Sequence, residues 1–266
     1  MAYKDIEVCW RDDNLVELVL SKQATHNAFD ANTISELLEA LNDVQVQTCK
    51  ALVLRAKGKC FSSGADLNWM RSQAAMSQSE NLADSMQLAQ LMKALDRFPR
   101  PTLALVQGPA YGGALGLIAC CDVAIANSQA KFCLSEVKLG IVPAVISPYV
   151  VRAMGMRAAR RYMLTAELFD AQMALELGLV HLIDDDLEQA AKPFINAFIN
   201  NGPQAMHTTK LLLQDVETKP LDDRLILRTA ETIARARVSA EGQMGLNAFF
   251  ERRQANWGEL TSNKEC

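Results

Sequence analysis

A pattern that recurs along the chain dictates most of its architecture: a short apolar run, a loop of small residues, and a segment with helical periodicity. The clearest copy spans residues 102–122, where the apolar run 102–106 is followed by Gly112 and Gly113 and then by a helical segment. Strands that alternate with helices form parallel sheets through right-handed crossovers. We therefore expect an α/β protein whose loops, and the functional groups they carry, gather at one edge of the sheet.

The glycine pair has a chemical consequence as well as a structural one. Backbone amides at the start of a helix lack intrahelical partners and lie at the positive end of the helix dipole. Glycines also allow a ligand to approach that backbone closely. Alone, the pair indicates no more than a tight turn between a strand and a helix, so a functional interpretation needs support from other residues.

Apolar runs and helical spacing predict the elements on either side of this stretch. Strands are expected at 6–10 and 15–20, joined by the polar turn 11–14, and at 51–56, 123–126 and 131–134. Helices are expected from about residue 30, with a capping box of Thr33 and Glu36, at 82–95 and at 149–163. Residues 60–79 predict a loop of small residues followed by polar, poorly periodic sequence, and residues 135–140 predict a turn.

Beyond residue 187 the strand signals fade and the sequence becomes helical. Helices are expected at 188–199, 204–214, 221–238 and 241–254. The apolar faces of such a tail must be covered either by the α/β body or by another copy of the chain.

Composition argues against several kinds of partner. The 266 residues are 50% hydrophobic, and 27 basic against 31 acidic residues give a formal net charge of -4 without a long basic run. This balance predicts no nucleic-acid partner and no anionic membrane partner. The apolar stretches are shorter than the roughly 18 residues that a membrane span needs, and the N-terminus lacks a signal pattern, so we expect a soluble, cytoplasmic protein.

Cysteine and histidine usage argues against a metal centre. The seven cysteines form no C-x-x-C pair, and most lie in apolar or strand-like surroundings, as buried free thiols do. None of the three histidines is clustered with cysteines or carboxylates in a metal-binding pattern; His181 and His207 fall on apolar patterns and are expected to be structural. We therefore predict a reducing compartment and no metal site.

Five short motifs in collinear order carry a resemblance to a known family. They are residues 61–67 (Phe-Ser-Ser-Gly-Ala-Asp-Leu), Gln107-Gly108 with Gly112-Gly113, Cys121-Asp122, Phe132 with Glu136, Gly140 and Pro143, and Glu241-Gly242 with Ala248-Phe249. This set resembles the crotonase, or enoyl-CoA hydratase/isomerase, family. The resemblance implies an α/β spiral of ββα repeats that binds acyl-CoA, residues 1–200, and a C-terminal all-helical trimerisation region, residues 201–266. It also implies a homotrimer or a hexamer made of two trimers.

The resemblance further implies the chemistry and its residues. Family members bind an acyl-CoA thioester and develop negative charge on its carbonyl oxygen, which preorganised backbone N–H groups stabilise by about 3 kcal/mol each. By resemblance the two donors are the amides of Ala65 and Gly113, and Glu136 is the carboxylate that transfers protons. Coenzyme A is part of the substrate, so no separate cofactor is expected.

The resemblance also assigns positions that contact the substrate or its CoA part. Within the α/β body these are Lys22, His26, Asn27, Ala28, Gly64, Asp66, Leu67, Gly112, Gly116 and Pro143. In the tail they are Phe249 and Arg252, which would close the adenine pocket of a neighbouring subunit.

Two departures from the family pattern leave the reaction open. Gly116 stands where hydratases usually carry a first glutamate, and residues 143–148 replace a loop that is rich in glycine in many relatives. Three hypotheses follow: Glu136 and a bound water hydrate a 2-enoyl-CoA; Glu136 alone moves a proton between C2 and C4, as in a 3,2-enoyl-CoA isomerase; or the chain is an RNA-binding or non-catalytic acyl-CoA-binding relative.

A finer resemblance favours hydration. The segments 64–70, 112–117, 132–137 and 141–144 are similar to those of bacterial methylglutaconyl-CoA hydratases, which share the glycine at position 116. Such a substrate has a distal carboxylate, and its partner is left open among Arg71, Lys93, Arg97 and the tail.

Overall fold

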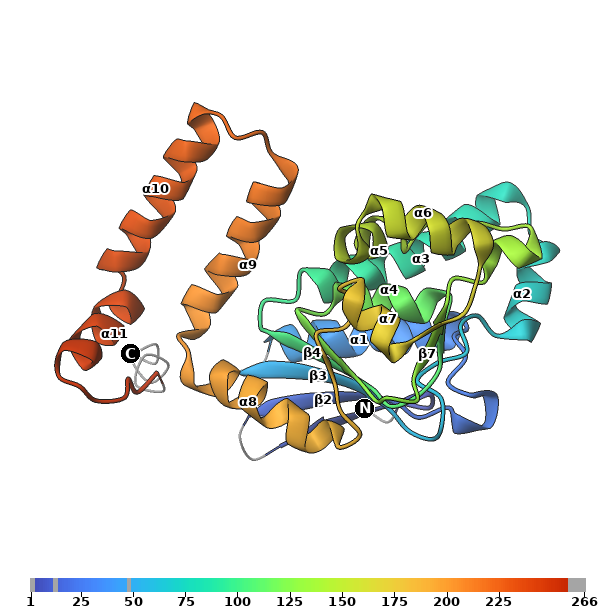
Figure 1. The fold of residues 1–266 in the computed structure, drawn as a ribbon, viewed down its shortest axis with the longest axis horizontal. Helices are drawn as coiled ribbons and strands as arrows, with labels where there is room; N and C mark the ends of the chain where they lie inside the picture. The colour runs from blue at the N-terminus through green and yellow to red at the C-terminus, as the bar shows by residue number, and fades with distance from the viewer. Residues whose placement is uncertain (1–2, 12–13, 47–48, 258–266) are drawn as a thin grey trace. The chain divides into compact units, whose positions relative to one another are not determined.

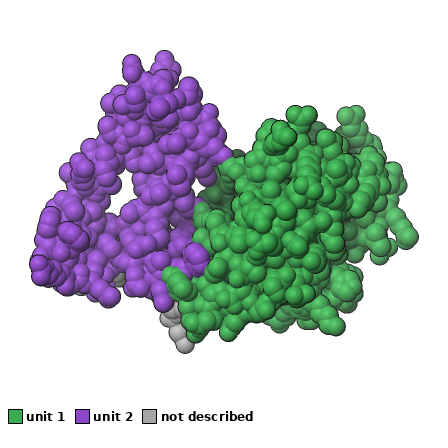
Figure 2. Space-filling view, in the orientation of Figure 1, with its two compact units in different colours: residues 1–98, 102–193 green, residues 99–101, 194–266 purple. Residues whose placement is uncertain are grey.

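The structure is a computed structural model that describes residues 3–11, 14–46 and 49–257. It divides into two compact units, residues 1–98 with 102–193 and residues 99–101 with 194–266 (Figure 2). The second unit thus begins at residue 194, whereas the sequence placed a division after residue 200. The predicted turn residues Asp12 and Asp13, and Cys266, lie outside the described residues.

The main sheet of the first unit is built from the apolar runs of the sequence. Within the described residues its order is β1 (Ile6–Trp10), β2 (Leu15–Leu20), β3 (Ala51–Ala56), β4 (Thr102–Val106), β6 (Val123–Ala126) and β9 (Leu182–Ile183). The β1–β2 pair is antiparallel and the other pairs are parallel. Leu18, Leu54, Ala104 and Ala124 form one row across four neighbouring strands, and each side chain is buried. The predicted hairpin and buried strands are confirmed.

A second, smaller sheet determines which loops meet. Its strands, in the order β5 (Ala110–Tyr111), β7 (Lys131–Cys133) and β8 (Phe169–Asp170), are short. Tyr111 pairs with Cys133, and the amide of Gly112 donates to the carbonyl of Cys133 over 2.9 Å. The chain segments that follow β5 and β7 therefore start side by side.

Helices cover the main sheet and lead into the second unit (Figure 1). Those of the first unit are α1 (Ala31–Val46), α2 (Leu67–Ala74), α3 (Gln78–Asp96), α4 (Gly113–Cys120), α5 (Ser147–Met154), α6 (Met156–Thr165) and α7 (Ala171–Glu176), with 3₁₀ turns at Gln23–Thr25 and Glu136–Leu139. Helix α8 (Leu187–Asn200) crosses the division between the units. Figure 1 shows α3, α4, α5 and α6 on one side of the sheet, where buried side chains of α1, α3, α4 and α5 contribute to the core.

The start of α1 differs from the predicted capping box. The carboxylate of Asp30 accepts the amide hydrogen of Thr33 over 2.9 Å, so Asp30 caps the helix. Glu36 instead accepts from the backbone amides of Lys4 and Asp5, both over 2.8 Å. The predicted cap was wrong because a tertiary contact with the start of β1 takes the side chain of Glu36.

Two further helix predictions were wrong in part. Helix α2 lies in the segment without clear periodicity; Asp66 begins it by accepting from the amides of Asn68 (2.9 Å) and Trp69 (3.2 Å). The single helix predicted at 149–163 is two helices, since Gly155 adopts φ 77° and ψ 153° between α5 and α6. The predicted turn at 135–140 contains a 3₁₀ helix.

The second unit consists of helices, as predicted. They are the end of α8, then α9 (Pro203–Thr218), α10 (Asp223–Val238) and α11 (Ala240–Phe250). Glu241 is only 8% exposed and its two carboxylate oxygens accept the amides of Gln204 (2.9 Å) and Ala205 (2.7 Å). These amides belong to the first turn of α9, where a negative charge is favoured. The Glu241 motif residue therefore fastens α11 to α9.

Two absences concern the described residues alone. None of their helices combines the length and the apolar character needed to cross a bilayer. Nor does any group of three or more His, Cys, Asp and Glu side chains among residues 3–11, 14–46 and 49–257 form a set that could hold a metal ion.

Candidate active site

The glycine pair lies at the start of α4, as the sequence predicted. Gly112 has φ 54° and ψ -123°, a conformation that strongly favours glycine, and it forms the N-cap of the helix. Gly113 is the first helical residue, so its N–H has no partner within the helix. The ring of Phe29 lies against Gly113, with carbon atoms 3.6 and 3.7 Å from where a Cβ would be.

The second predicted donor, Ala65, lies in a loop that pairs with Phe29. The carbonyl of Gly64 accepts from the Phe29 amide over 2.8 Å, and the amide of Asp66 donates to the Phe29 carbonyl over 2.7 Å. Since Ala65 lies between these two bonds in extended backbone, its own N–H points away from Phe29. Ala65 itself is exposed.

Backbone contacts hold the two loops together. The amide of Tyr111 donates to the carbonyl of Ser62 over 3.0 Å. Gly64 has φ +85°, and a Cβ added to it would lie 2.9 Å from the carbonyl oxygen of Tyr111. Only glycine suits this position, because the atom in the way belongs to the backbone. The loops that carry Ala65 and Gly113 are thus in direct contact.

Glu136 brings a carboxylate to the same loops. A Cβ added to Gly112 would lie 3.2 Å from Oε1 of Glu136, so the carboxylate rests against the glycine pair. Its other oxygen, Oε2, is buried and has no hydrogen-bond partner. Burial raises the pKa of Glu136 above its ordinary value. A half-buried carboxylate with one buried, unpartnered oxygen and a raised pKa is suited to act as a catalytic acid or base.

No second carboxylate projects from α4. Gly116, which is buried, follows Gly113 by three residues and therefore lies on the same face of the helix. A Cβ at Gly116 would lie 2.3 Å from Cγ2 of Ile146 and 3.0 Å from Sδ of Met92. Hydrocarbon and sulfur fill the space where the family's first glutamate would extend.

The predicted CoA-contacting loop is held by internal bonds. Lys22 forms ion pairs with Asp30 and, over 3.5 Å, with Asp5, so its charge is already partnered within the chain. Asn27 is buried and donates to the carbonyls of Lys57 and Cys60, both over 2.9 Å. These contacts give Lys22 and Asn27 a structural role, and contact with CoA stays a prediction.

The remaining predicted residues fall into two groups. In the first unit, His26 is exposed with φ 53°, Ala28 is buried, Leu67 is exposed at the start of α2 and Pro143 is half-buried. In the second unit, Phe249 is 76% exposed and Arg252 is exposed. The roles of Phe249 and Arg252 towards a neighbouring subunit also stay predictions.

Sequence reasoning missed two residues of the site. Phe29 supports both Gly113 and the Ala65 loop, and Ile146 fills the space beside Gly116. Phe29 directly follows the loop residues that the resemblance marked, which was a usable signal. The position of Ile146 had a weaker one, the replacement of the expected glycine-rich loop by residues 143–148.

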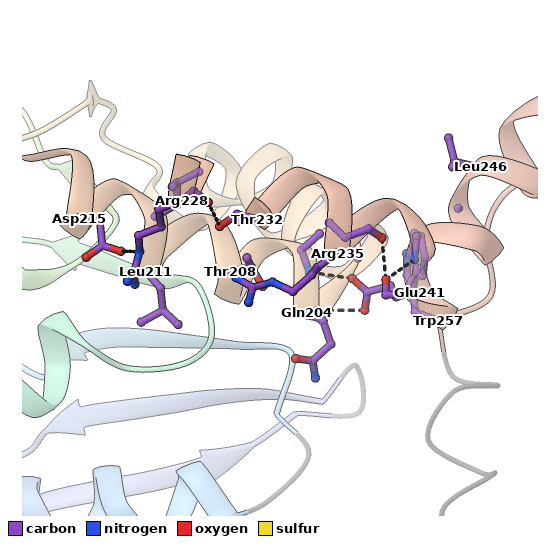
Figure 3. A pocket seen from close by; sticks show the side chains of 17 residues that line it. Gln204, Thr208, Leu211, Asp215, Arg228, Thr232, Arg235, Glu241, Leu246 and Trp257 are labelled. Carbon is purple, nitrogen blue, oxygen red and sulfur yellow. Dashed lines mark hydrogen bonds and ion pairs between the residues drawn. The ribbon is translucent and has the colours of Figure 1, made fainter. Parts of the chain in front are cut away.

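A cavity of ≈ 620 Å³ in the second unit does not offer comparable chemistry (Figure 3). It lies among α9, α10 and α11, and Figure 3 shows Glu241 and Arg235 at its wall. Both oxygens of Glu241 accept backbone amides, and Arg228 forms an ion pair with Asp215. Because those carboxylates have partners, we place the candidate active site at Glu136.

His181 and His207 lie outside this arrangement. Nδ1 of His181 accepts the amide hydrogen of Ala124 over 3.1 Å, which ties the segment between α7 and β9 to the main sheet. Burial lowers the pKa of His207, with the charges of Arg100 and Lys210 acting in the same direction.

The fold and the site together define a class: an α/β enzyme of the crotonase fold, in which the loops of Ala65 and Gly113 meet beside the half-buried carboxylate of Glu136. The profile of the enoyl-CoA hydratase/isomerase family matches residues 11–260. The chain belongs to the enoyl-CoA hydratase/isomerase family. An acyl-CoA substrate follows from that membership.

Relatives extend the match over nearly the whole chain. The crystal structure of an enoyl-CoA hydratase from Shewanella pealeana superposes with a TM-score of 0.94, at 56% identity and with 96% of each chain covered. The enoyl-CoA hydratase ACTT6 of Alternaria alternata is 33% identical over 88% of this chain and 78% of its own length. A mitochondrial delta(3,5)-delta(2,4)-dienoyl-CoA isomerase of Dictyostelium discoideum is 27% identical over 95% of this chain and 90% of its own. Hydratases and an isomerase thus both occur among the relatives.

Proposed function

We propose that the protein hydrates a 2-enoyl-CoA, with 3-methylglutaconyl-CoA or a similar branched acyl group as its substrate. The observation that carries the proposal is the free, buried Oε2 of Glu136 beside the glycine pair. The thioester oxygen would accept from the amides of Ala65 and Gly113, which draws electron density from the C2–C3 double bond.

Glu136 and one water can complete the reaction. The ionised carboxylate of Glu136 accepts a proton from the water while the water oxygen bonds to C3. The electrons of the C2–C3 double bond shift towards the thioester, and negative charge develops on the thioester oxygen. The protonated Glu136 then delivers that proton to C2 as the thioester carbonyl re-forms. One water is consumed, its OH group ends at C3 and its proton at C2, and Glu136 returns to its starting state.

A second candidate is a 3,2-enoyl-CoA isomerase, and the absence of a carboxylate at Gly116 favours it. In that reaction Glu136 removes a proton from C2 and returns it to C4 through the same oxyanion state. A single carboxylate suffices and no water takes part.

Three acyl-CoA compounds distinguish these functions. Hydration of 3-methylglutaconyl-CoA or crotonyl-CoA removes the conjugated double bond and its absorbance, whereas isomerisation of a 3-enoyl-CoA creates that absorbance. We expect 3-methylglutaconyl-CoA to be hydrated with a higher kcat/KM than crotonyl-CoA. If only the 3-enoyl-CoA is converted, the protein is an isomerase and the proposal of a hydratase is wrong. Turnover of none of the three, together with tight RNA binding at moderate salt, would indicate a binding protein.

We also propose that the second unit assembles the chain into a trimer, or a hexamer of two trimers. Large apolar side chains on α9, α10 and α11 are exposed in the single chain, among them Leu213 (61%), Val238 (77%) and Phe250 (73%). Exposed apolar side chains in such numbers mark an interaction surface. Sedimentation of the wild-type protein as a monomer would contradict this proposal.

Replacing Glu241 by alanine is expected to weaken this assembly. The variant removes the acceptor of the Gln204 and Ala205 amides in the first turn of α9, and the loss of such a helix-capping acceptor costs about 0.5–2 kcal/mol of unfolding free energy. Thermal unfolding and sedimentation measure the two effects. The matched control is Glu231→Ala on the exposed side of α10, which should change stability by less than about 0.5 kcal/mol. Equal stability of the two variants would show that Glu241 does not fasten α9.

A further inference from the structure

The two departures from the family pattern meet at one point in the structure. Gly116 lacks the expected glutamate, and residues 143–148 lack the expected glycines. A Cβ added to Gly116 would lie 2.3 Å from Cγ2 and 2.9 Å from Cβ of Ile146. Observed Cβ contacts are essentially never shorter than 3.0 Å, so no side chain fits at position 116 while Ile146 stays in place. The side chain of Ile146 occupies the space that a glutamate at 116 would need.

Ile146 is held firmly in that position. It is 2% exposed, and its carbonyl accepts from the amides of Tyr149 and Val150, both over 3.1 Å, at the start of α5. Its branched Cβ restricts rotation about χ1. On the other side of the same point lies Sδ of Met92, which is fully buried. The atoms nearest to Gly116 are therefore hydrocarbon and thioether sulfur, which carry no proton.

We propose that Ile146 is a specificity-determining residue that restricts proton transfer in this site to Glu136. Gly113 and Gly116 lie on one face of α4, so Ile146 fills the position, one turn from the Gly113 amide, where the family pattern has a glutamate. Water is then activated only by Glu136, which rests against Gly112. The inference deepens the proposed function and rests on it for the identity of the substrate.

Paired substitutions test the packing. Gly116→Glu is expected to lower the melting temperature by about 10 °C, because it crowds a packed core and buries a carboxylate. Adding Ile146→Ala should lower it no further, since the smaller side chain gives the glutamate room. The matched control adds Val150→Ala to Gly116→Glu; Val150 is buried and lies one turn further along α5. The melting temperature of this pair should fall by the sum of the losses of its two single variants. Additive losses in the Ile146 pair would overturn the proposal.

A milder pair covers the case in which Gly116→Glu does not fold. Alanine in a helix interior is normally more favourable than glycine, which would raise the melting temperature. Here Gly116→Ala should instead lower it, and Ile146→Ala should remove that penalty. A stabilised Gly116→Ala variant would show that Ile146 does not fill the place.

Activity tests the specificity. In the Ile146→Ala background, Gly116→Glu supplies a second carboxylate, and crotonyl-CoA hydration should rise about tenfold or more over Ile146→Ala alone. The pH profile of kcat/KM should also gain a second ionising group, which a change in packing alone would not produce. An unchanged rate and profile would overturn the specificity role. If the wild-type enzyme hydrates no acyl-CoA, the proposed function fails, while the melting experiments still decide whether Ile146 occupies the place.

Discussion

Replacing Glu136 by glutamine is expected to lower kcat for the acyl-CoA substrate about 10³-fold, within the range that general acid–base catalysis contributes. Glutamine has nearly the same shape but can neither accept nor carry the proton. The amides of Ala65 and Gly113 are unchanged, so acyl-CoA should still bind with a similar dissociation constant. Steady-state kinetics and equilibrium binding of a saturated acyl-CoA measure the two effects separately. The control is Glu39→Gln on the exposed side of α1, which should keep kcat.

The pKa of Glu136 adds a test with a definite sign. Burial raises that pKa in the folded protein, so the folded state favours the uncharged carboxyl. The protonated carboxyl of Glu136 contributes fully to the free energy of unfolding below the ordinary pKa of glutamic acid, and this contribution is lost as pH rises through the raised pKa of the folded state. Glutamine is uncharged at every pH, so at pH 7 the variant should melt at the same temperature as the wild type or higher. The wild-type kcat/KM should fall as pH drops through the raised pKa of Glu136, because the carboxylate must be ionised to accept a proton.

Near-normal turnover of the Glu136→Gln variant would show that Glu136 does not transfer the proton.

The framework of the fold could be predicted because it depends on local patterns. The runs that form β3 and β4 are short, apolar and bounded by breakers, as strands buried on both faces are. The alternation of such runs with helical segments then specified a parallel sheet with its loops at one edge. Gly112 at the start of α4 followed from the same local pattern.

The meeting of Gly112 with Glu136 could not be predicted from local patterns. It depends on the pairing of β5 with β7, and β5 has only two residues, too few to show any periodicity. The family resemblance supplied the role of Glu136, but the contact with Gly112 and the unpartnered Oε2 required the structure. Ile146 was beyond prediction for the same reason, since α5 and α4 meet through packing.

The incorrect predictions followed local sequence patterns, and another contact or a backbone conformation determined the structure instead. Glu36 had the spacing of a capping box, yet it binds the amides that precede β1. Helix α2 has a poor apolar pattern and forms at the Asp66 cap. Gly155 interrupts a segment whose spacing continues through it, because its conformation is one that other residues rarely adopt.

Replacing Gly64 by alanine is expected to lower kcat about 10²–10³-fold, the usual cost of losing one oxyanion donor. The new Cβ would lie 2.9 Å from the carbonyl oxygen of Tyr111. The Cβ is fixed to the backbone of residue 64 and the oxygen belongs to the backbone of Tyr111, so no side-chain rotation can separate them. Either the Ala65 loop or the peptide that leads to Gly112 must shift. Either shift moves one of the two amides away from the thioester oxygen, and a displacement of this size matters because the donors act only at hydrogen-bond distance.

Backbone strain must be separated from this collision, and Gly155 provides the control. Gly64 and Gly155 both have positive φ, +85° and +77°, so alanine is strained at either position. A Cβ at Gly155, however, would have no atom within 4 Å. Gly155→Ala should therefore lose stability, by about 1–3 kcal/mol, while keeping kcat. Gly64→Ala should lose kcat at temperatures where both variants are fully folded. Equal kcat values in Gly64→Ala and Gly155→Ala would contradict this prediction. They would show that the contact between the two loops does not hold the amides in place.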